Sequence, residues 1–533
     1  MQLTAQHTSV LIVGAGPSGL MMAAQLLRYG IQPIIIDSKQ GPTNHSKALA
    51  VQARSLEIYR QMGVVERVIR DGKPASGVIF NKDGKHQAQF SMANIDHPDT
   101  LYPFIFIYEQ SKNERILLDY LTQNCCPVYW GTTISTVKQN QDKVLIQLSS
   151  GTETISLTCD WLIGADGAHS LVRKQLQIPF NGDTYAEEFY LADVELEDSG
   201  LDGSYAQLFS AGGDFAVFVP MFEKETYRII GKVPKTTKRY DQLSLEDILP
   251  RLQHIVGRPL IVVKNKWFTT YRLHHRMADE FRKNRCFLIG DAAHIHSPVG
   301  GQGMNTGLQD AYNLAWKLAG VISRKLDACI LDSYSGERMP VAKTLLKTTD
   351  RAFKVILSQS WFLGLFKKWL LPASLNYFWN TPRIKQAFFR RVSQTGISYR
   401  SSNINLHLGN STKIKAGDRL PCIKLYDSKK QQQTDLHEWC SKPGFTFIAM
   451  GTINDMDLFA LAKWVSQNYP GMNFFYLPPS AKNQEVFDVF EVDQRRGKSI
   501  IVRPDMHIGF MNDAVDMYQM DNYLRNITGI LSA

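Results

Sequence analysis

The first forty residues alternate between short apolar runs and an amphipathic segment. Ser9–Val13 is apolar and rich in β-branched residues, a pattern that predicts a buried parallel strand. Leu20–Tyr29 predicts a helix, and Ile31–Ile36 predicts a second strand that ends at Asp37. A strand, a helix and a strand in this order predict a βαβ unit with parallel strands.

A glycine-rich turn separates the first strand from the helix. Its spacing is G-x-G-x-x-G, in which each glycine has a role. Gly14 allows the tight turn, Gly16 lets the backbone approach a pyrophosphate closely, and Gly19 lets the helix pack on the strand. Pro17 and Ser18 complete the turn at a helix N-terminus, where free N–H groups favour phosphate. The turn therefore predicts a dinucleotide site.

Asp37 stands where an acid can accept hydrogen bonds from a ribose diol. A carboxylate at this position disfavours a 2′-phosphate, so NADP is not the expected resident of the site. The motif alone does not separate FAD from NAD.

Two later segments repeat the order of strand, glycine and aspartate. The first is Trp161–Arg173, and the second is Arg285–His294. The second continues into a segment with glycines at positions 300, 301, 303 and 307, which predicts an unpacked loop that a flat ligand can approach. Ala311–Leu318 predicts the helix that follows.

Residues 180–279 alternate between apolar and polar positions, as expected for an antiparallel sheet covering a pocket. The expected strands are Phe189–Leu196, Phe215–Pro220 and Tyr227–Lys232. Phe215, Val217 and Val219 are candidates to line a substrate pocket, although plain sheet core is an equal alternative for each of them. Residues 405–533 predict short strands at Phe445–Met450, Phe474–Leu477 and Ile500–Val502 around the helix Met456–Gln467, the pattern of a thioredoxin-like sandwich.

Composition excludes several classes of protein. With 44% hydrophobic and 21% charged residues, the chain buries a core and is neither disordered nor collagen-like. Its seven cysteines include no C-x-x-C pair, which argues against a disulfide scaffold and a metal site and favours the reducing cytoplasm. The polar N-terminus lacks the basic region of a signal peptide, and no apolar run is long enough to span a membrane.

The formal charge of +10, taken over the whole chain, suggests binding to nucleic acid or to an anionic membrane. Its position along the chain changes this interpretation. Residues 341–400 hold eleven basic residues against Asp350, so the rest of the chain sums to zero. Nucleic acid binding is therefore not expected. The same segment holds eleven aromatic residues, and three interpretations stay open: packed connecting helices, a dimer face or cover over the substrate entrance, and reversible membrane docking through Trp361–Leu371.

The three glycine motifs together resemble the group A flavoprotein monooxygenases, the single-component FAD-dependent aromatic hydroxylases. They read GAGPSG at 14–19, GADGAHSLVR at 164–173 and FLIGDAAHIHSPVGGQGMNTGLQDAYNLAWKLA at 287–319. The likeness is closest to the branch of phenol hydroxylase, pentachlorophenol monooxygenase and 3-hydroxyphenylpropionate hydroxylase. It covers residues 8–345 well and 405–533 more loosely.

The resemblance implies an α/β fold with a Rossmann-like FAD-binding domain, an inserted antiparallel substrate domain and a thioredoxin-like C-terminal domain. The expected boundaries are 1–179 and 280–345 for the FAD domain, 180–279 for the substrate domain, 346–404 for the basic connection and 405–533 for the last domain. It also implies FAD as bound cofactor and NAD(P)H as transient co-substrate.

The resemblance further implies a set of site residues. The FAD contacts are Gly14, Gly16, Pro17, Ser18, Gly19, Asp37, Lys47, Arg54, Gln110, Asp166, Asp291, Gly303, Met304 and Asn305. Pro298, His296 and Arg54 are the candidates beside the reacting ring. Lys47 departs from the family's usual arginine and keeps the charge without the bidentate fork.

The implied reaction reduces FAD with NAD(P)H and uses O₂, through a flavin C4a-hydroperoxide, to hydroxylate a small phenol-like aromatic. Epoxidation or Baeyer–Villiger oxidation of a lipophilic or polyketide-like substrate, a non-oxygenating flavin oxidoreductase and a non-catalytic flavin-binding protein stay open as alternatives. We expect a cytoplasmic protein with no stable membrane binding, and the branch leaves a homodimer open.

Overall fold

The computed structural model describes residues 3–43, 48–92, 97, 99–234, 242–296, 301–357, 381–493 and 497–531, with only the backbone at 351–357. Lys47, Pro298 and Trp361–Leu371, all named above, lie outside these ranges. Among the described residues, no helix is long and apolar enough to cross a membrane.

The N-terminal sheet has the strand order β17-β18-β11-β1-β2-β8, and β10 pairs with both β11 and β9. β1, β2, β8, β11 and β18 pair in parallel, whereas β9, β10 and β17 pair antiparallel. The strands are β1 (His7–Val13), β2 (Ile34–Asp37), β8 (Val128–Trp130), β9 (Thr132–Gln139), β10 (Val144–Ser150), β11 (Glu153–Gly164), β17 (Arg282–Lys283) and β18 (Cys286–Leu288). Val10, Leu11 and Ile12 of β1 are completely buried, as its continuous apolar run predicts.

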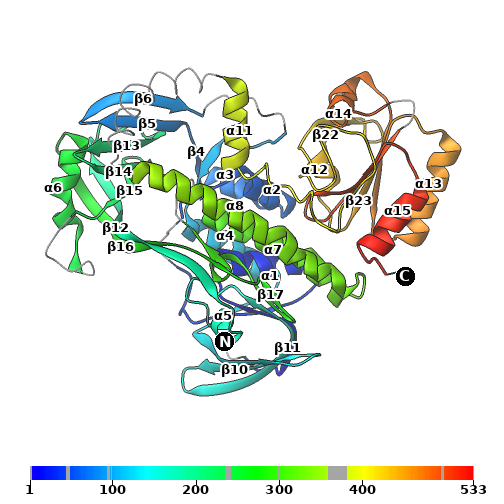
Figure 1. The fold of residues 1–533 in the computed structure, drawn as a ribbon, viewed down its shortest axis with the longest axis horizontal. Coiled ribbons are helices and arrows are strands. Elements are labelled where there is room, and N and C mark those ends of the chain that lie inside the picture. The colour runs from blue at the N-terminus through cyan, green and yellow to red at the C-terminus, as the bar shows by residue number, and fades with distance from the viewer. Residues whose placement is uncertain are drawn as a thin grey trace.

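Helices pack beside this sheet. They are α1 (Pro17–Arg28), α4 (Gln110–Gln123), α5 (Leu171–Gln175), α7 (Gly303–Ile322) and α8 (Asp332–Leu357), together with the one-turn η2 (Gly290–Ala292) and η3 (Ala328–Leu331). α8 runs across the molecule toward the second sheet, and α1, α4 and α7 lie close together beneath it (Figure 1).

The second sheet has the order β19-β16-β12-β15-β14-β13-β5-β6. Its strands are β5 (Gly77–Lys82), β6 (Lys85–Ser91), β12 (Phe180–Glu197), β13 (Tyr205–Ala211), β14 (Asp214–Pro220), β15 (Thr226–Lys232), β16 (Ile261–Ala278) and β19 (His294–Ile295). α6 (Leu245–Val256) covers one face. The sheet therefore takes the hairpin β5–β6 and the short β19 from outside the expected range 180–279. A three-stranded sheet, β3 (Ala50–Val51), β7 (Ile105–Ile107) and β4 (Lys73–Ala75), lies beside it.

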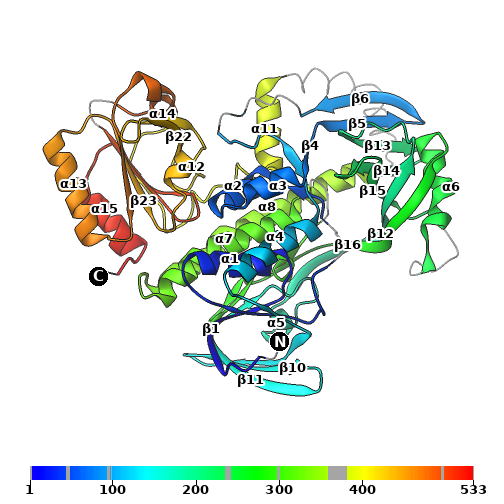
Figure 2. The ribbon, with the colours of Figure 1, turned by 180° about the vertical axis from the view of Figure 1, so that it is seen from behind.

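The C-terminal part is a separate lobe in both ribbon views (Figure 2). Its sheet has the order β20-β26-β25-β23-β24, with β23 and β24 parallel and β25 antiparallel to both neighbours. This topology confirms the thioredoxin-like pattern. The elements are β20 (Leu406–His407), β21 (Lys424–Asp427), β22 (Gln432–Asp435), α12 (Leu436–Trp439), β23 (Thr446–Met450), α13 (Asp455–Asn468), β24 (Asn473–Leu477), η5 (Ala481–Asn483), α14 (Gln484–Val489), β25 (Lys498–Val502), β26 (Ile508–Asn512), α15 (Met517–Asn522) and η6 (Tyr523–Ile527).

Buried ion pairs join this lobe to α7 and α8. The Glu337 carboxylate accepts from Lys317 Nζ at 2.7 Å and from Arg503 Nη1 at 2.6 Å, and Arg503 Nη2 donates to Asp505 at 2.6 Å. Burial lowers the pKa of Lys317 to about 8, although Glu337 opposes that shift. Buried charges with this many mutual hydrogen bonds require exact geometry, so the network fixes how the lobe sits on the helices.

α2 (Ala53–Gln61), α3 (Val65–Arg70) and α11 (Pro382–Val392) complete the N-terminal part, and α2 contacts the C-terminal lobe through the pair of Arg60 and Asp435. α11 comes from the basic, aromatic segment. Its Phe389 is fully buried with its ring 4.9 Å from that of His97, while Arg390 pairs with Asp99 at 3.1 Å. This part of the segment therefore packs as a connecting helix.

The expectation of an unpacked glycine loop through position 307 is wrong. α7 begins at Gly303 and includes Gly307, which is buried. A Cβ at Gly307 would overlap the Ser18 hydroxyl and lie 3.0 Å from the Cα of Gly290. The glycine serves close packing of α7 on α1, which the spacing of glycines alone does not distinguish from loop flexibility.

Candidate functional site

The glycine turn after β1 has the geometry that its spacing predicts. Gly14 has a φ of 105°, and a Cβ there would overlap the carbonyl of Ala165. A Cβ on Gly19 would overlap the Gly14 carbonyl. A Cβ on Gly16, by contrast, would meet nothing within 4 Å.

Gly16 is also the N-cap of α1, where no side chain caps the helix and Pro17 occupies the first position. The free N–H groups of this helix end therefore border an open space that a side chain would fill. Such a cradle suits a phosphate, which the helix dipole favours. The residues present fit the pyrophosphate of a dinucleotide.

Asp37 closes the turn from the end of β2. Its Oδ2 accepts from the backbone N–H of Ala15 at 2.7 Å, and its Oδ1 accepts from that of Lys39 at 2.8 Å. A carboxylate has about four acceptor positions, so these two bonds leave capacity for a diol. The contact with a ribose stays a prediction.

The fold brings the three glycine motifs together. Ala165 of the second motif contacts Gly14, and Gly290 of the third approaches Ser18, so residues far apart in the sequence border one turn. The strand–glycine segments end at the same edge of the sheet because β1, β11 and β18 are parallel neighbours. Ligands of open α/β sheets bind at this edge.

The loop that contains Asp291 is held by a buried acid, Asp310, which sequence reasoning did not single out. One oxygen of Asp310 accepts from the N–H of Gly290 at 3.0 Å and lies 2.7 Å from His294 Nε2, while the other accepts from Arg338 Nε at 2.7 Å. Despite complete burial, Arg338 and His294 lower the pKa of Asp310 to about 2. Asp291 itself is exposed beside this rigid support. The signal in the sequence that could have identified Asp310 is an acidic residue within the apolar run of α7.

The start of α7 carries Gly303, Met304 and Asn305. The side chain of Asn305 is fully buried and accepts from Gln52 N at 2.9 Å and Ser55 Oγ at 2.8 Å. The helix has no side-chain cap, so backbone N–H groups are what its first turn presents to a ligand.

His296 lies next to this helix start, because a Cβ on Gly303 would be 3.4 Å from His296 Nε2. This places His296 near the predicted ring contacts, and its part in the reaction stays a prediction. Pro298 is two residues further on, outside the described residues.

Arg54, Gln110 and Asp166 all have structural contacts. Arg54 is buried, with Nη1 on Glu57 at 3.0 Å and Nη2 on the carbonyl of Asp505 at 2.7 Å. Gln110 Oε1 accepts from the N–H of Ala48 at 3.2 Å.

Asp166 accepts from the N–H groups of Leu171 at 2.7 Å and Val172 at 3.1 Å, and burial raises its pKa. It therefore anchors the start of α5. The predicted contacts of Arg54, Gln110 and Asp166 with FAD or NAD(P)H stay predictions beside these structural ones.

The second sheet presents a half-buried face opposite α6. Phe215, Val217 and Val219 alternate with Ala216 and Phe218, which are buried in the cluster against α6. The three candidates therefore share the opposite face.

On that face, Arg228 lies beside Val219 in the strand register and pairs with Asp193 through two bonds of 2.7 Å. Tyr271 lies opposite Phe189 of this face in the register of β12 and β16. Burial raises the pKa of Tyr271 to about 12, so its hydroxyl is neutral. The face combines apolar area with a fixed ion pair.

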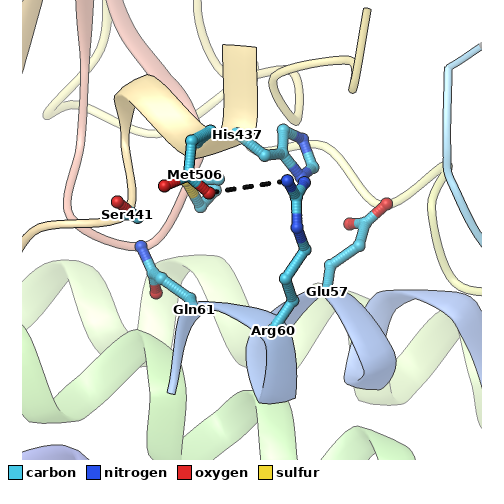
Figure 3. A pocket seen from close by; sticks show the side chains of 7 residues that line it. Glu57, Arg60, Gln61, His437, Ser441 and Met506 are labelled. Carbon is cyan, nitrogen blue, oxygen red and sulfur yellow. Dashed lines mark ion pairs between the residues drawn. The ribbon is translucent and has the colours of Figure 1, made fainter. Parts of the chain in front are cut away.

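A small hollow lies between the two lobes (Figure 3). Arg60 reaches across it from α2 and pairs with Asp435 at 2.8 Å and with Glu438 at 3.5 Å. The hollow is lined by Glu57, Arg60, Gln61, His437, Glu438, Ser441 and Met506 and has a volume of about 10 Å³. That volume holds a single water, so this hollow is not a substrate site.

Two family models match the chain. One described as an FAD binding domain matches residues 7–349, and one described as the phenol hydroxylase C-terminal dimerisation domain matches residues 461–529. The chain is 35% identical to 6-methylpretetramide 4-monooxygenase of Streptomyces rimosus over 66% of this chain and 63% of that protein. It is 33% identical to pentachlorophenol 4-monooxygenase of Sphingobium chlorophenolicum over 78% of this chain and 76% of that protein.

Solved structures share the whole fold. The flavin-dependent monooxygenase PieE, solved with FAD and substrate, has a TM-score of 0.81 at 21% identity and covers 98% of this chain and 99% of its own. The Diels-Alderase PyrE3 has a TM-score of 0.75 at 22% identity and covers 99% of this chain and all of its own. At these identities the likeness establishes the fold alone.

Proposed function

The chain belongs to the family of FAD-dependent aromatic monooxygenases, and from that premise we propose that it hydroxylates a phenol-like aromatic substrate with NAD(P)H and O₂. The observation that carries the proposal is the cradle at Gly16, open where a side chain would fill it, in a turn that the second and third motifs contact at Gly14 and Ser18. A family relative is named for pentachlorophenol, which supports the phenol-like class.

The residues of the cradle divide the binding of FAD between them. The turn of Gly14, Gly16 and Gly19 at the start of α1 would hold the pyrophosphate, and Asp37 would hold the ribose. Asp291 stands exposed beside the turn on a loop that Asp310 fixes, which suits contact with the ribityl chain. FAD supplies hydride acceptance and oxygen activation, which no side chain provides.

The start of α7 would act electrostatically. The N–H groups of Gly303, Met304 and Asn305 stand in its first turn, where they have no partner within the helix. They favour negative charge, each contact of this kind contributing ~0.3–1 kcal/mol and more when partly buried. We propose that they face the ring edge that becomes negative on reduction, with His296 and Pro298 at the adjoining substrate side.

The half-buried face with Phe215, Val217 and Val219 would orient the substrate and exclude water. An apolar wall with one fixed polar group is typical of small-molecule pockets, and the Arg228–Asp193 pair supplies that group. A lipophilic, polyketide-like substrate is the second candidate, because another relative is named for 6-methylpretetramide.

A panel of simple phenols and polycyclic phenols tests the proposal. We expect one class to accelerate NAD(P)H oxidation and to yield hydroxylated product, with NADH and NADPH compared in parallel. A purified chain that does not bind FAD, or that oxidises NAD(P)H without modifying any member of the panel, would refute it. We also propose a cytoplasmic enzyme, since all seven cysteines are unpaired.

We further propose a homodimer formed through α13 and α15, which lie side by side (Figures 1 and 2) and are joined by a 2.6 Å bond from Tyr469 to Asp521. Their outer surface exposes Met456 by 84%, Phe459 by 71% and Tyr518 by 77%. Such apolar exposure is typical of an interface, and the dimerisation-domain match, residues 461–529, covers α15 and the C-terminal part of α13.

Analytical ultracentrifugation tests the dimer. Phe459→Asp should convert dimer to monomer because a carboxylate would be buried at the contact. Phe222→Asp, which changes an exposed phenylalanine of the second sheet's surface, should leave the dimer intact. A wild-type chain that sediments as a monomer at micromolar concentration would contradict the proposal.

A further inference from the structure

Three residues after α11, Ser393–Thr395, form a buried loop at the junction of α2, α7 and the C-terminal lobe. Their exposed fractions are 0, 4 and 6%. A loop this deep must satisfy its polar groups within the protein, and the partners it uses show what it holds.

Within the described part of the chain, the hydrogen bonds of the Gln394 side chain go to the beginning of α7. Its Nε2 donates to Thr306 Oγ1 at 2.8 Å and lies 3.4 Å from the carbonyl oxygen of Gln302, while its Oε1 accepts from Gln309 Nε2 at 2.6 Å. Gln302 is the residue before the helix, and the other two lie in its first two turns. One amide therefore spans the N-terminal end of α7.

The backbone of Gln394 is held in a conformation that a glutamine rarely adopts. Its φ of 61° lies in the left-handed region, where a side chain is disfavoured. Surrounding contacts must enforce such a conformation, and residues of this kind cluster where precise positioning is required.

The neighbours of Gln394 extend this constraint on both sides. The carbonyl of Ser393 accepts from the N–H of Arg54 at 3.2 Å, near the start of α2. The carbonyl of Thr395 accepts from Arg419 Nε at 3.1 Å, and Arg419 also pairs with Glu57 at 3.0 Å. The loop is therefore fixed by the C-terminal lobe while it holds the beginnings of two helices of the N-terminal part.

We propose that Gln394 is a positioning residue that fixes the N-terminal turn of α7 against bound FAD and so links the C-terminal lobe to the flavin. The proposal rests on the proposed function, in which the N–H groups of this turn face the flavin ring. The side chain of Asn305 anchors the same turn from the side of Gln52. With both anchors in place, the turn is preorganised before FAD binds.

The test compares Gln394→Leu and Gln394→Glu with wild type. The readouts are the FAD dissociation constant, the visible spectrum of the bound flavin and its reduction potential. Gln431→Leu is the matched control, because Gln431 also has a positive φ of 54° but is exposed on the hairpin β21–β22.

Gln394→Leu removes the bonds of the amide to Thr306 and Gln309. It should weaken FAD binding at least about tenfold, the scale of one buried hydrogen bond, and shift the flavin spectrum. Gln394→Glu keeps the acceptor for Gln309 and adds a negative charge at the helix start. It should therefore lower the reduction potential, because reduced flavin is itself negative. Gln431→Leu should match wild type in all three readouts.

The proposal is overturned if both Gln394 variants have the FAD dissociation constant, the flavin spectrum and the reduction potential of wild type, even if the variants unfold at a lower temperature. If Gln394→Leu does not fold, the potential of Gln394→Glu decides alone. Failure of the wild-type chain to bind FAD would instead refute the proposed function, so the two failures are distinguishable.

Discussion

Replacing Gly16 with alanine separates the binding role of the glycine turn from its structural role. Gly16 has a φ of −80° and a ψ of −178°, a conformation open to alanine, and the new methyl group would touch nothing within 4 Å. A substitution of this kind restricts the unfolded chain and raises the free energy of unfolding by ~0.4–1 kcal/mol. The protein without FAD should be at least as stable as wild type.

FAD binding should respond in the opposite direction. The methyl group would occupy the space in which a pyrophosphate meets the start of α1, so at least one charge-assisted hydrogen bond to phosphate is lost. Such a bond contributes ~1.5–3 kcal/mol, so its loss corresponds to a ~10–150-fold larger dissociation constant.

The assay combines FAD titration by flavin fluorescence with thermal unfolding in the absence and presence of FAD. At a concentration of 100 times its dissociation constant, FAD should stabilise wild type by ~2.7 kcal/mol, and Gly16→Ala should lose much of this gain. Gly203→Ala is the control, because a Cβ there also meets open space but lies on a turn of the second sheet. Wild-type FAD affinity in Gly16→Ala would refute the assignment of the cradle.

Two further changes test the support around the cradle. Gly19→Ala should lower the free energy of unfolding by ~1–3 kcal/mol even without FAD, because its Cβ overlaps the Gly14 carbonyl; an unchanged urea midpoint would contradict the packing. Asp310→Asn should cost ~3–5 kcal/mol, because Arg338 is left buried without its carboxylate; a loss below 1 kcal/mol in urea unfolding would contradict this. The pKa of Asp310 is about 2 in the fold and 3.8 ordinarily, so its stabilisation is complete above about pH 4 and is lost as the pH falls toward 2. Urea unfolding from pH 5 to 2 should therefore show a larger loss of stability in wild type than in Asp310→Asn, in which the other carboxyl groups still titrate.

The sequence predicted the site's turn well because its chemistry is local. The run Ser9–Val13, the glycine spacing and Asp37 lie within thirty residues, and each has one structural solution. In the structure Gly14 has a positive φ, Gly16 borders open space and Gly19 lies in close contact with the Gly14 carbonyl.

The support of the site escaped prediction because its partners are distant in sequence. Asp310 pairs with Arg338 on another helix, and Arg503 of the C-terminal lobe reaches Glu337. No periodicity marks such pairs, since a buried charge in a helix resembles a solvated one until its partner is known. Gly307 shows a related limit, because helix packing and loop flexibility both favour glycine.

Basic and aromatic side chains of the segment 341–400 serve packing at its C-terminal end. The +10 is confined to this segment, and its described end, α11, buries Phe389 and pairs Arg390 with Asp99. The segment then supplies Gln394 to the start of α7. Connecting helices that pack on the N-terminal part account for this end, and the interpretations that depend on Trp361–Leu371 stay predictions.

Incorporation of isotopically labelled O₂ distinguishes a monooxygenase from other enzymes of this fold, which also occurs in a Diels-Alderase. The chain loaded with FAD is supplied with NAD(P)H, labelled O₂ and the most active phenol of the panel, and the product is analysed by mass spectrometry. We expect one labelled oxygen atom in the aromatic product for each NAD(P)H consumed. A product without the label, or NAD(P)H consumption that yields only hydrogen peroxide, would contradict this expectation.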